Sequence, residues 1–198
     1  IQPNHNADRK QRRKQDKLID CPICFFMLIL PQILPHFPQD IDRFVDLFCG
    51  GGNVGINVPC NRVVFNDNNE LLRYMFGTFK NLDKQVTFET IDAIIEKYGL
   101  SNTEKYGYDF YGCNSAEGLA TYNSSRYLKL RDDFNHHTNL EYNYYVTLYV
   151  LIVYAFNNQI RFNRKGEFNL PVGKRDFNKK MREKLSTFID RLKSGDYS

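Results

Sequence analysis

The residues best suited to chemistry are a run of glycines and an aspartate some way downstream. Gly50, Gly51 and Gly52 follow one apolar segment, and Asp67 follows the next. A glycine turn after a strand lets backbone N–H groups approach a ligand, and a helix behind it adds its positive N-terminus. Asp67 has the spacing expected of a carboxylate that accepts hydrogen bonds from both ribose hydroxyls. We therefore predict a site for an adenosine-containing cofactor; a purely structural strand-to-helix turn is the alternative.

Two other nucleotide-binding patterns do not fit this glycine run. The sequence has no GxxxxGK[ST] element, which disfavours a phosphate loop that hydrolyses nucleoside triphosphates. The segment Phe48–Gly52 also lacks the wider GxGxxG spacing of a dinucleotide fold.

Basic residues are concentrated in two segments of a chain whose net charge is only +4. Residues 1–20 carry +3, residues 160–183 carry +5, and the rest sums to −4. Such patches favour binding to a phosphate backbone, although a solvated helix face would show the same composition. Residues 159–173 predict a hairpin that turns near Lys165 and Gly166. Four polar or basic side chains cluster about it: Arg161, Asn163, Asn169 and Lys174.

The cysteines are odd in number and irregularly spaced, so reduced thiols are expected: Cys21, Cys24, Cys49, Cys60 and Cys113. The CxxC pair at 21–24 has no second pair to complete a zinc site, and we predict no metal. The longest apolar stretches, 23–30 and 146–156, are shorter than the roughly 18 residues of a membrane span. With no secretory signal visible either, we expect a cytoplasmic protein without membrane contact.

The elements that would position these residues alternate in type. After a loose, basic arm at 1–29 and a Pro-interrupted helix at 30–38, strands are predicted at 43–48 and 62–65. A helix is predicted at 54–58 and another after Asn69, the latter with one apolar face: Leu71, Leu72, Met75, Phe76 and Phe79. This alternation is typical of a parallel α/β sheet.

The pattern then becomes helical. A helix is predicted with Thr87 as its cap and Gly99 as its end, and it would turn Phe88, Ile91, Ile94, Ile95 and Tyr98 inward. Aromatic residues crowd the segment from Tyr106 to Phe156, which is typical of a core. Within it, 140–156 is predicted to be a buried helix because its apolar residues do not alternate with period two.

Three motifs in order resemble those of the Dam-type, alpha-class DNA adenine-N6 methyltransferases. Residues 44–55 resemble the FxGxG cofactor motif, and residues 64–72 the ribose-binding segment. Residues 161–173 resemble the R[YF]NxxGxFNxPxG element of the target-recognition domain. The resemblance implies a partial, Rossmann-like methyltransferase sheet at 30–82. It also implies an inserted, mainly helical recognition domain at 83–184 with a β-hairpin at 159–173, and a return to the catalytic domain at 185–198.

The same resemblance implies a ligand for each part. S-adenosylmethionine would be held by Phe48, Gly50, Gly52 and Asp67. Double-stranded DNA would be read by the hairpin around Arg161, and the DNA backbone would be placed by Asn157, Asn163, Asn169, Pro171 and Lys174. The implied activity is site-specific methyl transfer to N6 of adenine, in a restriction-modification system or as an orphan methylase.

Two features depart from that family. Residues 21–28 occupy the place of a Lys- and Gly-containing cofactor motif but contain no glycine. No proline has a proline neighbour, so the catalytic DPPY motif is absent, and the chain stops at Ser198, close to where that motif should begin. We therefore predict no catalytic residue in this chain, which we expect to be a truncated or split N-terminal part, inactive alone and completed by a second polypeptide. A non-catalytic DNA-binding module is the alternative, and a methyltransferase of small molecules or RNA is a third interpretation.

Overall fold

A computed structural model describes residues 29–113, 116–137 and 142–198. The expected loose arm, the Cys21 and Cys24 pair and the glycine-free segment at 21–28 lie outside these residues, except for position 29. Among the described residues, Cys49, Cys60 and Cys113 are free thiols.

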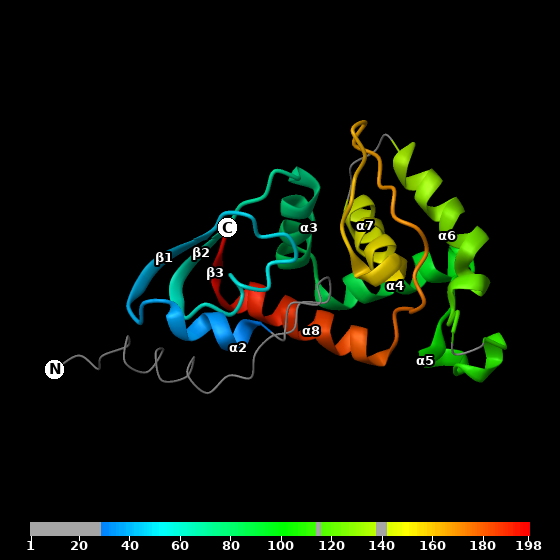
Figure 1. Ribbon diagram of the computed structural model, residues 1–198, viewed down its shortest axis with the longest axis horizontal. Coiled ribbons are helices and arrows are strands. Elements are labelled where there is room, and N and C mark those ends of the chain that lie inside the picture. The colour runs from blue at the N-terminus through cyan, green and yellow to red at the C-terminus, as the bar shows by residue number, and fades with distance from the viewer. Residues whose placement is uncertain (1–28, 114–115, 138–141) are drawn as a thin grey trace.

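Three parallel strands form the sheet, which lies at one end of the molecule (Figure 1). They are β1 (Ile41–Asp46), β2 (Cys60–Phe65) and β3 (Asp196–Tyr197), in the order β1-β2-β3. β-Branched and aromatic residues favour strands in β1 and β2, and Cys60, Val63 and Phe65 of β2 are buried. The predicted parallel sheet is confirmed, but β1 begins two residues earlier than predicted and ends at Asp46 because the chain turns at Leu47.

The helix predicted after Asn69 is present as α3 (Glu70–Asn81). The Asn69 side chain caps it by accepting a hydrogen bond from the backbone N–H of Leu71 at 3.0 Å. Four of the five residues of the predicted apolar face are buried: Leu72, Met75, Phe76 and Phe79. The fifth, Leu71, is only partly buried.

The helix predicted at 54–58 is wrong. This segment is a series of turns, in which the N–H of Ile56 donates to Gly52 and the N–H groups of Asn57 and Val58 donate to the carbonyl of Val54. Pro59 and the start of β2 at Cys60 leave no room for further helical turns. Upstream, the Pro-interrupted helix is a short α2 (Leu30–Ile33) followed by a 3-10 turn, η2 (Leu34–His36).

The helical part begins with α4 (Lys84–Tyr98), whose predicted cap is wrong. Asp83 caps it instead, because its carboxylate accepts from the N–H groups of Gln85 and Val86 at 2.7 and 3.2 Å. Thr87 lies inside the helix and is buried. The predicted end is confirmed, since Gly99 adopts a left-handed conformation with φ of 63°.

The core of the helical part is α7 (Tyr142–Tyr154), which packs against α3, α4 and α6 (Ala120–Asn135). Its buried run from Leu148 to Tyr154 covers all sides of the helix, as expected of a central helix. The predicted buried helix is therefore confirmed over these residues, but it ends at Tyr154 rather than at Phe156, and residues 140–141 lie outside the described ranges. Short elements surround the core: α5 (Thr103–Tyr106), η3 (Asp109–Tyr111) and η4 (Phe156–Asn158).

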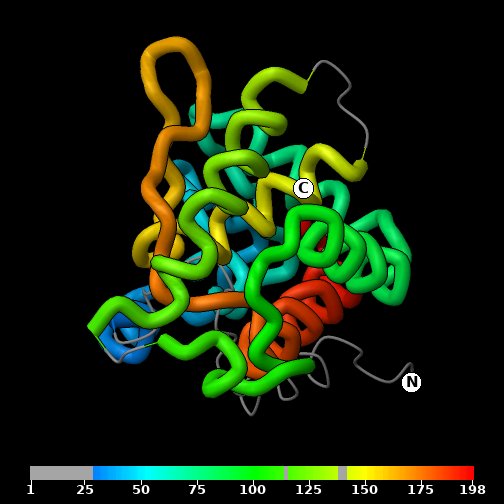
Figure 2. Tube along the Cα trace, turned by 90° about the vertical axis from the view of Figure 1, so that its right-hand side faces the viewer, coloured from blue at the N-terminus to red at the C-terminus, as the bar shows by residue number. Residues whose placement is uncertain are grey.

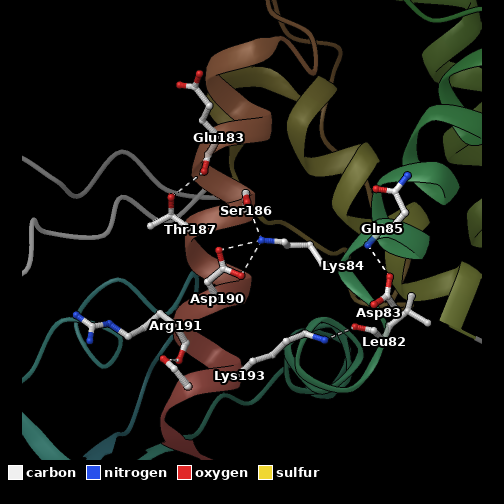
Figure 3. A network of polar contacts seen from close by, with 11 residues as sticks. Leu82, Asp83, Lys84, Gln85, Glu183, Ser186, Thr187, Asp190, Arg191 and Lys193 are labelled. Carbon is white, nitrogen blue, oxygen red and sulfur yellow. Dashed lines mark hydrogen bonds and ion pairs between the residues drawn. The ribbon is translucent and has the colours of Figure 1, made fainter.

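The last helix, α8 (Lys179–Ser194), runs from the helical part back to the sheet, where β3 follows it (Figures 1 and 2). Figure 3 shows how it holds the junction between α3 and α4. The Lys84 ammonium contacts the Asp190 carboxylate at 2.8 Å, and Lys193 donates to the carbonyl oxygen of Leu82 at 2.6 Å. α8 therefore contacts the chain at Leu82 and at Lys84, on either side of Asp83, where the sheet part continues into the helical part.

No helix within the described ranges is both long and apolar enough to cross a membrane.

Candidate cofactor and DNA-binding site

The carboxylate of Asp67 organises the glycine turn that follows β1. Its Oδ2 atom accepts a hydrogen bond from the backbone N–H of Gly50 at 2.9 Å, and its Oδ1 atom accepts one from the N–H of Asn69, also at 2.9 Å. Both partners lie where β1 and β2 end, so the sheet brings together two motifs that are separated in sequence. Each carboxylate oxygen has further lone-pair capacity for a ligand.

A second carboxylate, Asp46, holds the far end of the same turn. Asp46 is 9% exposed, and its Oδ2 atom accepts from the N–H of Gly55 at 2.9 Å. Burial raises the pKa of Asp46, and the nearby negative charge of Asp67 raises it further. Sequence reasoning missed this residue; the signal was an acid within the predicted strand 43–48, four residues before the first glycine of the run.

Aromatic rings form the floor beneath the turn. A side chain at Gly52, whose φ is +76°, would meet the rings of Phe65 and Phe76 at 3.4 Å. The Phe65 ring stacks in turn on Tyr197 of β3, with ring centroids 5.6 Å apart. At Gly55 a Cβ atom would lie only 2.7 Å from the Phe65 ring, so the turn can pack this closely only with glycine.

The predicted use of backbone donors needs correction. The N–H groups of Gly50, Gly52 and Gly55 donate within the protein, to Asp67, to the Cys49 carbonyl and to Asp46. With turns in place of a helix at 54–58, no helix N-terminus stands behind them either.

The accessible parts of this site are the Phe48 ring and the space beside Gly50. Phe48 is 83% exposed, and no atom lies within 4 Å of a Cβ built at Gly50. Burial raises the pKa of the neighbouring Cys49 thiol to about 12, with help from the charges of Asp46 and Asp67. Cys49 is therefore a neutral thiol at physiological pH and cannot serve as a nucleophile.

The predicted hairpin is present as a loop with one antiparallel bridge, between Phe162 and Phe168. The N–H of Asn163 donates to the carbonyl of Glu167 at 2.9 Å, and Gly166 turns the chain with φ of 78°. Its end projects from the helical part next to the end of α6 (Figures 1 and 2).

The structure pairs several of the predicted DNA-binding residues with one another. Arg161 donates from Nε to the side-chain oxygen of Asn169, and from Nη2 to its backbone carbonyl, both at 2.9 Å. Asn163 donates to the Glu167 carboxylate at 2.6 Å. Arg161 is exposed and has further N–H donors, so it could contact DNA without leaving Asn169.

The other predicted residues lie at the base of the hairpin. Lys174 donates to the carbonyl of Ala116 at 2.6 Å, and the Pro171 carbonyl accepts from the N–H of Phe156. Asn157 is exposed and adopts a left-handed conformation with φ of 54°, which asparagine tolerates better than most residues.

The hairpin is anchored firmly to the helical core. The Asn135 side chain at the end of α6 donates to the carbonyl of Phe168 at 3.0 Å and accepts from its N–H at 2.8 Å. Tyr127 and Arg131 of the same helix both donate to the carbonyl of Leu170. Side-chain hydrogen bonds from α6 therefore hold the hairpin against the helical part.

Comparison with known proteins agrees with this arrangement. The family of D12 class N6 adenine-specific DNA methyltransferases matches residues 27–197. The chain belongs to this family. The matched residues include both the site of Asp67 and Gly50 and the hairpin.

Among the described residues, no group of His, Cys, Asp or Glu is arranged to hold a metal ion.

Individual relatives of this chain are modification methylases or methyltransferases. It is 35% identical over 170 residues to the modification methylase StsI of Streptococcus sanguinis, covering 85% of this chain and 22% of the relative. It is 34% identical over 166 residues to the type II methyltransferase M.FokI of Planomicrobium okeanokoites, covering 83% and 22%. For the modification methylase LlaI of Lactococcus lactis subsp. lactis, identity is 27% over 176 residues, covering 86% and 25%. The chain thus spans about a quarter or less of the length of these relatives.

Proposed function

We propose that this chain supplies the cofactor turn and the DNA-recognition unit of a site-specific methyltransferase. The reaction would move a methyl group from S-adenosylmethionine to N6 of adenine in duplex DNA, within a restriction-modification system. The observation that carries the proposal is the Asp67 carboxylate bonded to Gly50 at the carboxyl end of two parallel strands. In open α/β sheets, ligands bind at this end of the strands.

The residues present fit the adenosine part of the cofactor. Each carboxylate oxygen of Asp67 accepts one hydrogen bond from the protein backbone. Each oxygen can accept a second hydrogen bond, so the carboxylate could bind both ribose hydroxyls. The exposed Phe48 ring offers an apolar face for a flat base, and the open space beside Gly50 lets a ligand approach the backbone. Gly52 acts indirectly, by allowing the turn to rest on Phe65 and Phe76.

When bound, S-adenosylmethionine supplies an electrophilic methyl group. The chain's own task is to hold the cofactor and the DNA in one fixed relation, since orientation supplies much of the rate in such transfers. Asp46 and Asp67 fix the two ends of the cofactor turn, and the contacts of α8 with Leu82 and Lys84 join this part to the recognition unit.

The hairpin would bind the duplex through the positive charge of residues 160–183 and read sequence through Arg161. An arginine can contact O6 and N7 of guanine, and the Asn169 contacts hold the Arg161 side chain in one orientation. Contact with phosphate is the other use of this side chain. Asn157, Asn163, Asn169, Pro171 and Lys174 would place the backbone about it.

The groups that accept from the N6 amine are proposed to come from outside these 198 residues. The sequence contains no adjacent prolines and hence no DPPY motif. Asp109 to Tyr111 offer an acid and aromatic rings, but they lie in η3, beside α5 at the opposite end of the helical part from the hairpin's turn (Figure 1). A DPPY-bearing segment, in the same or in a second polypeptide, would complete the site.

A non-catalytic DNA-binding module is the second candidate. It is favoured by one observation: three N–H groups of the glycine turn already donate within the protein, so the turn does not require a ligand to satisfy them.

The test is transfer of tritiated methyl groups from S-adenosylmethionine to unmethylated duplex DNA. The 198 residues alone should give no transfer, and addition of a DPPY-bearing polypeptide should give N6-methyladenine. Turnover by these residues alone would contradict our assignment of the catalytic groups. If the completed protein methylates only another base, the proposed reaction is wrong.

A further inference from the structure

A pocket of about 530 Å³ lies where the second half of α4 meets α5, η3 and α6. This volume is within the range of sites that bind ligands. In Figure 1, α5 lies at the lower end of the helical part and the hairpin's turn at the upper end, so the pocket is on the side away from the loop that is proposed to bind DNA. Aromatic rings and carboxylates line it, among them Tyr106, Phe110, Tyr111, Asp92, Glu96 and Glu104.

Two of the aromatic side chains are widely exposed. Phe110 is 64% exposed and Tyr106 is 49% exposed, and their rings stack with centroids 5.0 Å apart. Tyr111 differs, because its hydroxyl accepts a hydrogen bond from the backbone N–H of Asn102 at 2.7 Å and so supports the local fold. Phe110 and Tyr106 have no such task. Exposed aromatic rings that touch one another are typical of surfaces that bind another protein.

The charge of the pocket is negative, although the whole chain carries +4. Three carboxylates line the pocket against two cations, Lys105 and Arg182. Arg182 pairs with two of these carboxylates, those of Asp92 and Glu104. The third, Glu96, is exposed, and it forms no ion pair with any other residue that the structure describes. A surface of this sign attracts a cation and repels the phosphates of DNA.

The chain already holds one guanidinium group beside this pocket with rings and carboxylates. The guanidinium carbon of Arg182 lies 5.2 and 5.0 Å from the ring centroids of Phe88 and Phe177. Its N–H groups contact Asp92 at 2.6 Å and Glu104 at 3.1 Å. A guanidinium suits such a site because it is flat enough to stack on a ring while its edge donates to a carboxylate. An ammonium group has no flat face to stack.

We propose that this pocket is a docking site for a partner protein, which places an arginine side chain on the Phe110 ring and beside the Glu96 carboxylate. Tyr106 extends the apolar surface for the residues that flank this arginine. Arginine and aromatic side chains carry much of the binding energy in protein interfaces. Since the hairpin's turn lies at the opposite end of the helical part, the chain can bind DNA and this partner at the same time (Figure 1).

The test is a nuclear magnetic resonance titration of the isotope-labelled chain with the blocked peptide Leu-Ala-Arg-Ala-Leu. The backbone signals of Glu96, Glu104 and Phe110 should shift and saturate. The same peptide with citrulline in place of arginine should bind about tenfold more weakly or worse, because citrulline keeps the shape of the side chain but loses its charge. A lysine peptide should also bind more weakly, because its ammonium cannot stack.

Two variants of the chain test the proposed contacts. Phe110→Ala and Glu96→Gln should each weaken binding of the arginine peptide about fivefold or more, and both positions are exposed, so the variants should fold. Phe156→Ala is the control for the first, since Phe156 is 44% exposed but lies in η4, outside the pocket. Glu89→Gln, at an exposed position of α4 outside the pocket, is the control for the second. Neither control should change the affinity for the peptide.

The inference is overturned if the wild type does not bind the arginine peptide, if the citrulline or lysine peptide binds equally well, or if the two folded pocket variants bind as the wild type does. It is also overturned if free arginine amide binds as tightly as the peptide, since the site would then serve a small molecule.

The affinity of Phe110→Ala and Glu96→Gln for duplex DNA should equal that of the wild type. Loss of DNA binding in these variants would place the pocket on the DNA surface and contradict a docking site. Failure of the proposed function looks different, because the wild type would then bind the arginine peptide but not DNA.

Discussion

The backbone N–H of Gly50 donates to Oδ2 of Asp67 at 2.9 Å, across 17 positions of sequence. Asp67 thus shapes the glycine turn, and we propose that it also binds a ribose. Asp46 performs only the first task, at the Gly55 end, where it is buried. Substitutions at the two carboxylates should therefore have different effects.

The hairpin should bind DNA through its charge, and Arg161 should contribute to it. We expect the affinity of the chain for duplex DNA to fall steeply with salt, and Arg161→Ala to weaken binding. If the variant also discriminates less between DNA sequences, Arg161 reads a base; if only the salt slope falls, by about one, it contacts a phosphate. Salt-independent binding, or none at low salt, would argue against a recognition unit.

Gly173 should be required for the base of the hairpin. A Cβ at position 173 would lie 2.4 Å from the backbone oxygen of Ala155. The backbone N–H of Gly173 donates to the Tyr154 carbonyl at 2.7 Å, which holds the two segments this close. Gly173→Ala should lower the free energy of unfolding by about 1–3 kcal/mol, as overpacking does. The measurement is urea unfolding followed by circular dichroism.

Gly77→Ala is the control for that variant. Gly77 lies inside α3, and a Cβ there would meet no atom within 4 Å apart from its own helix backbone and chain neighbours. Replacement should stabilise the protein by about 0.5–1 kcal/mol, because alanine favours a helix. If Gly173→Ala proved as stable as the wild type, the tight packing of the hairpin base would be disproved.

Much of this architecture follows from local sequence. The glycine run, the apolar face of the helix after Asn69, the end of α4 at Gly99 and the apolar run of α7 each predict structure through patterns that act within a few residues. The pairing of Asp67 with the turn also follows, because parallel strands end at one edge of the sheet.

Two predictions were wrong although the reasons are local: Pro59 directly follows 54–58, and Asp83, four residues before Thr87, caps α4. The remaining features depend on contacts between distant residues. That Arg161 pairs with Asn169, and that Asn135 holds Phe168, depends on how the hairpin folds onto α6. Such side-chain partners have no local signature.

Ionisation of Asp46 should make the free energy of unfolding depend on pH. Burial raises its pKa above the ordinary value of 3.8, so between 3.8 and the raised value the folded state holds more protons than the unfolded state. Ionisation of Asp46 therefore lowers stability as pH rises through that window. Asp46→Asn lacks this loss while keeping an oxygen that can accept from Gly55.

Urea unfolding from below pH 3.8 to neutrality measures this effect. The stability of Asp46→Asn relative to the wild type should rise through the window and then level off. Asp42→Asn, at an exposed position of the same strand, is the matched control for replacing a carboxylate by an amide. A constant difference between Asp46→Asn and wild type would contradict the burial of this charge.

Calorimetric titration of the chain with S-adenosylhomocysteine tests the cofactor site most directly. The wild type should bind. Asp67→Ala should lose about 1–3 kcal/mol of binding free energy, the contribution of hydrogen bonds to a charged group. Arg161→Ala should bind as the wild type does, because the hairpin lies apart from the turn. Equal affinities of wild type and Asp67→Ala, or no binding by the wild type, would contradict the assignment of this glycine turn as a cofactor site.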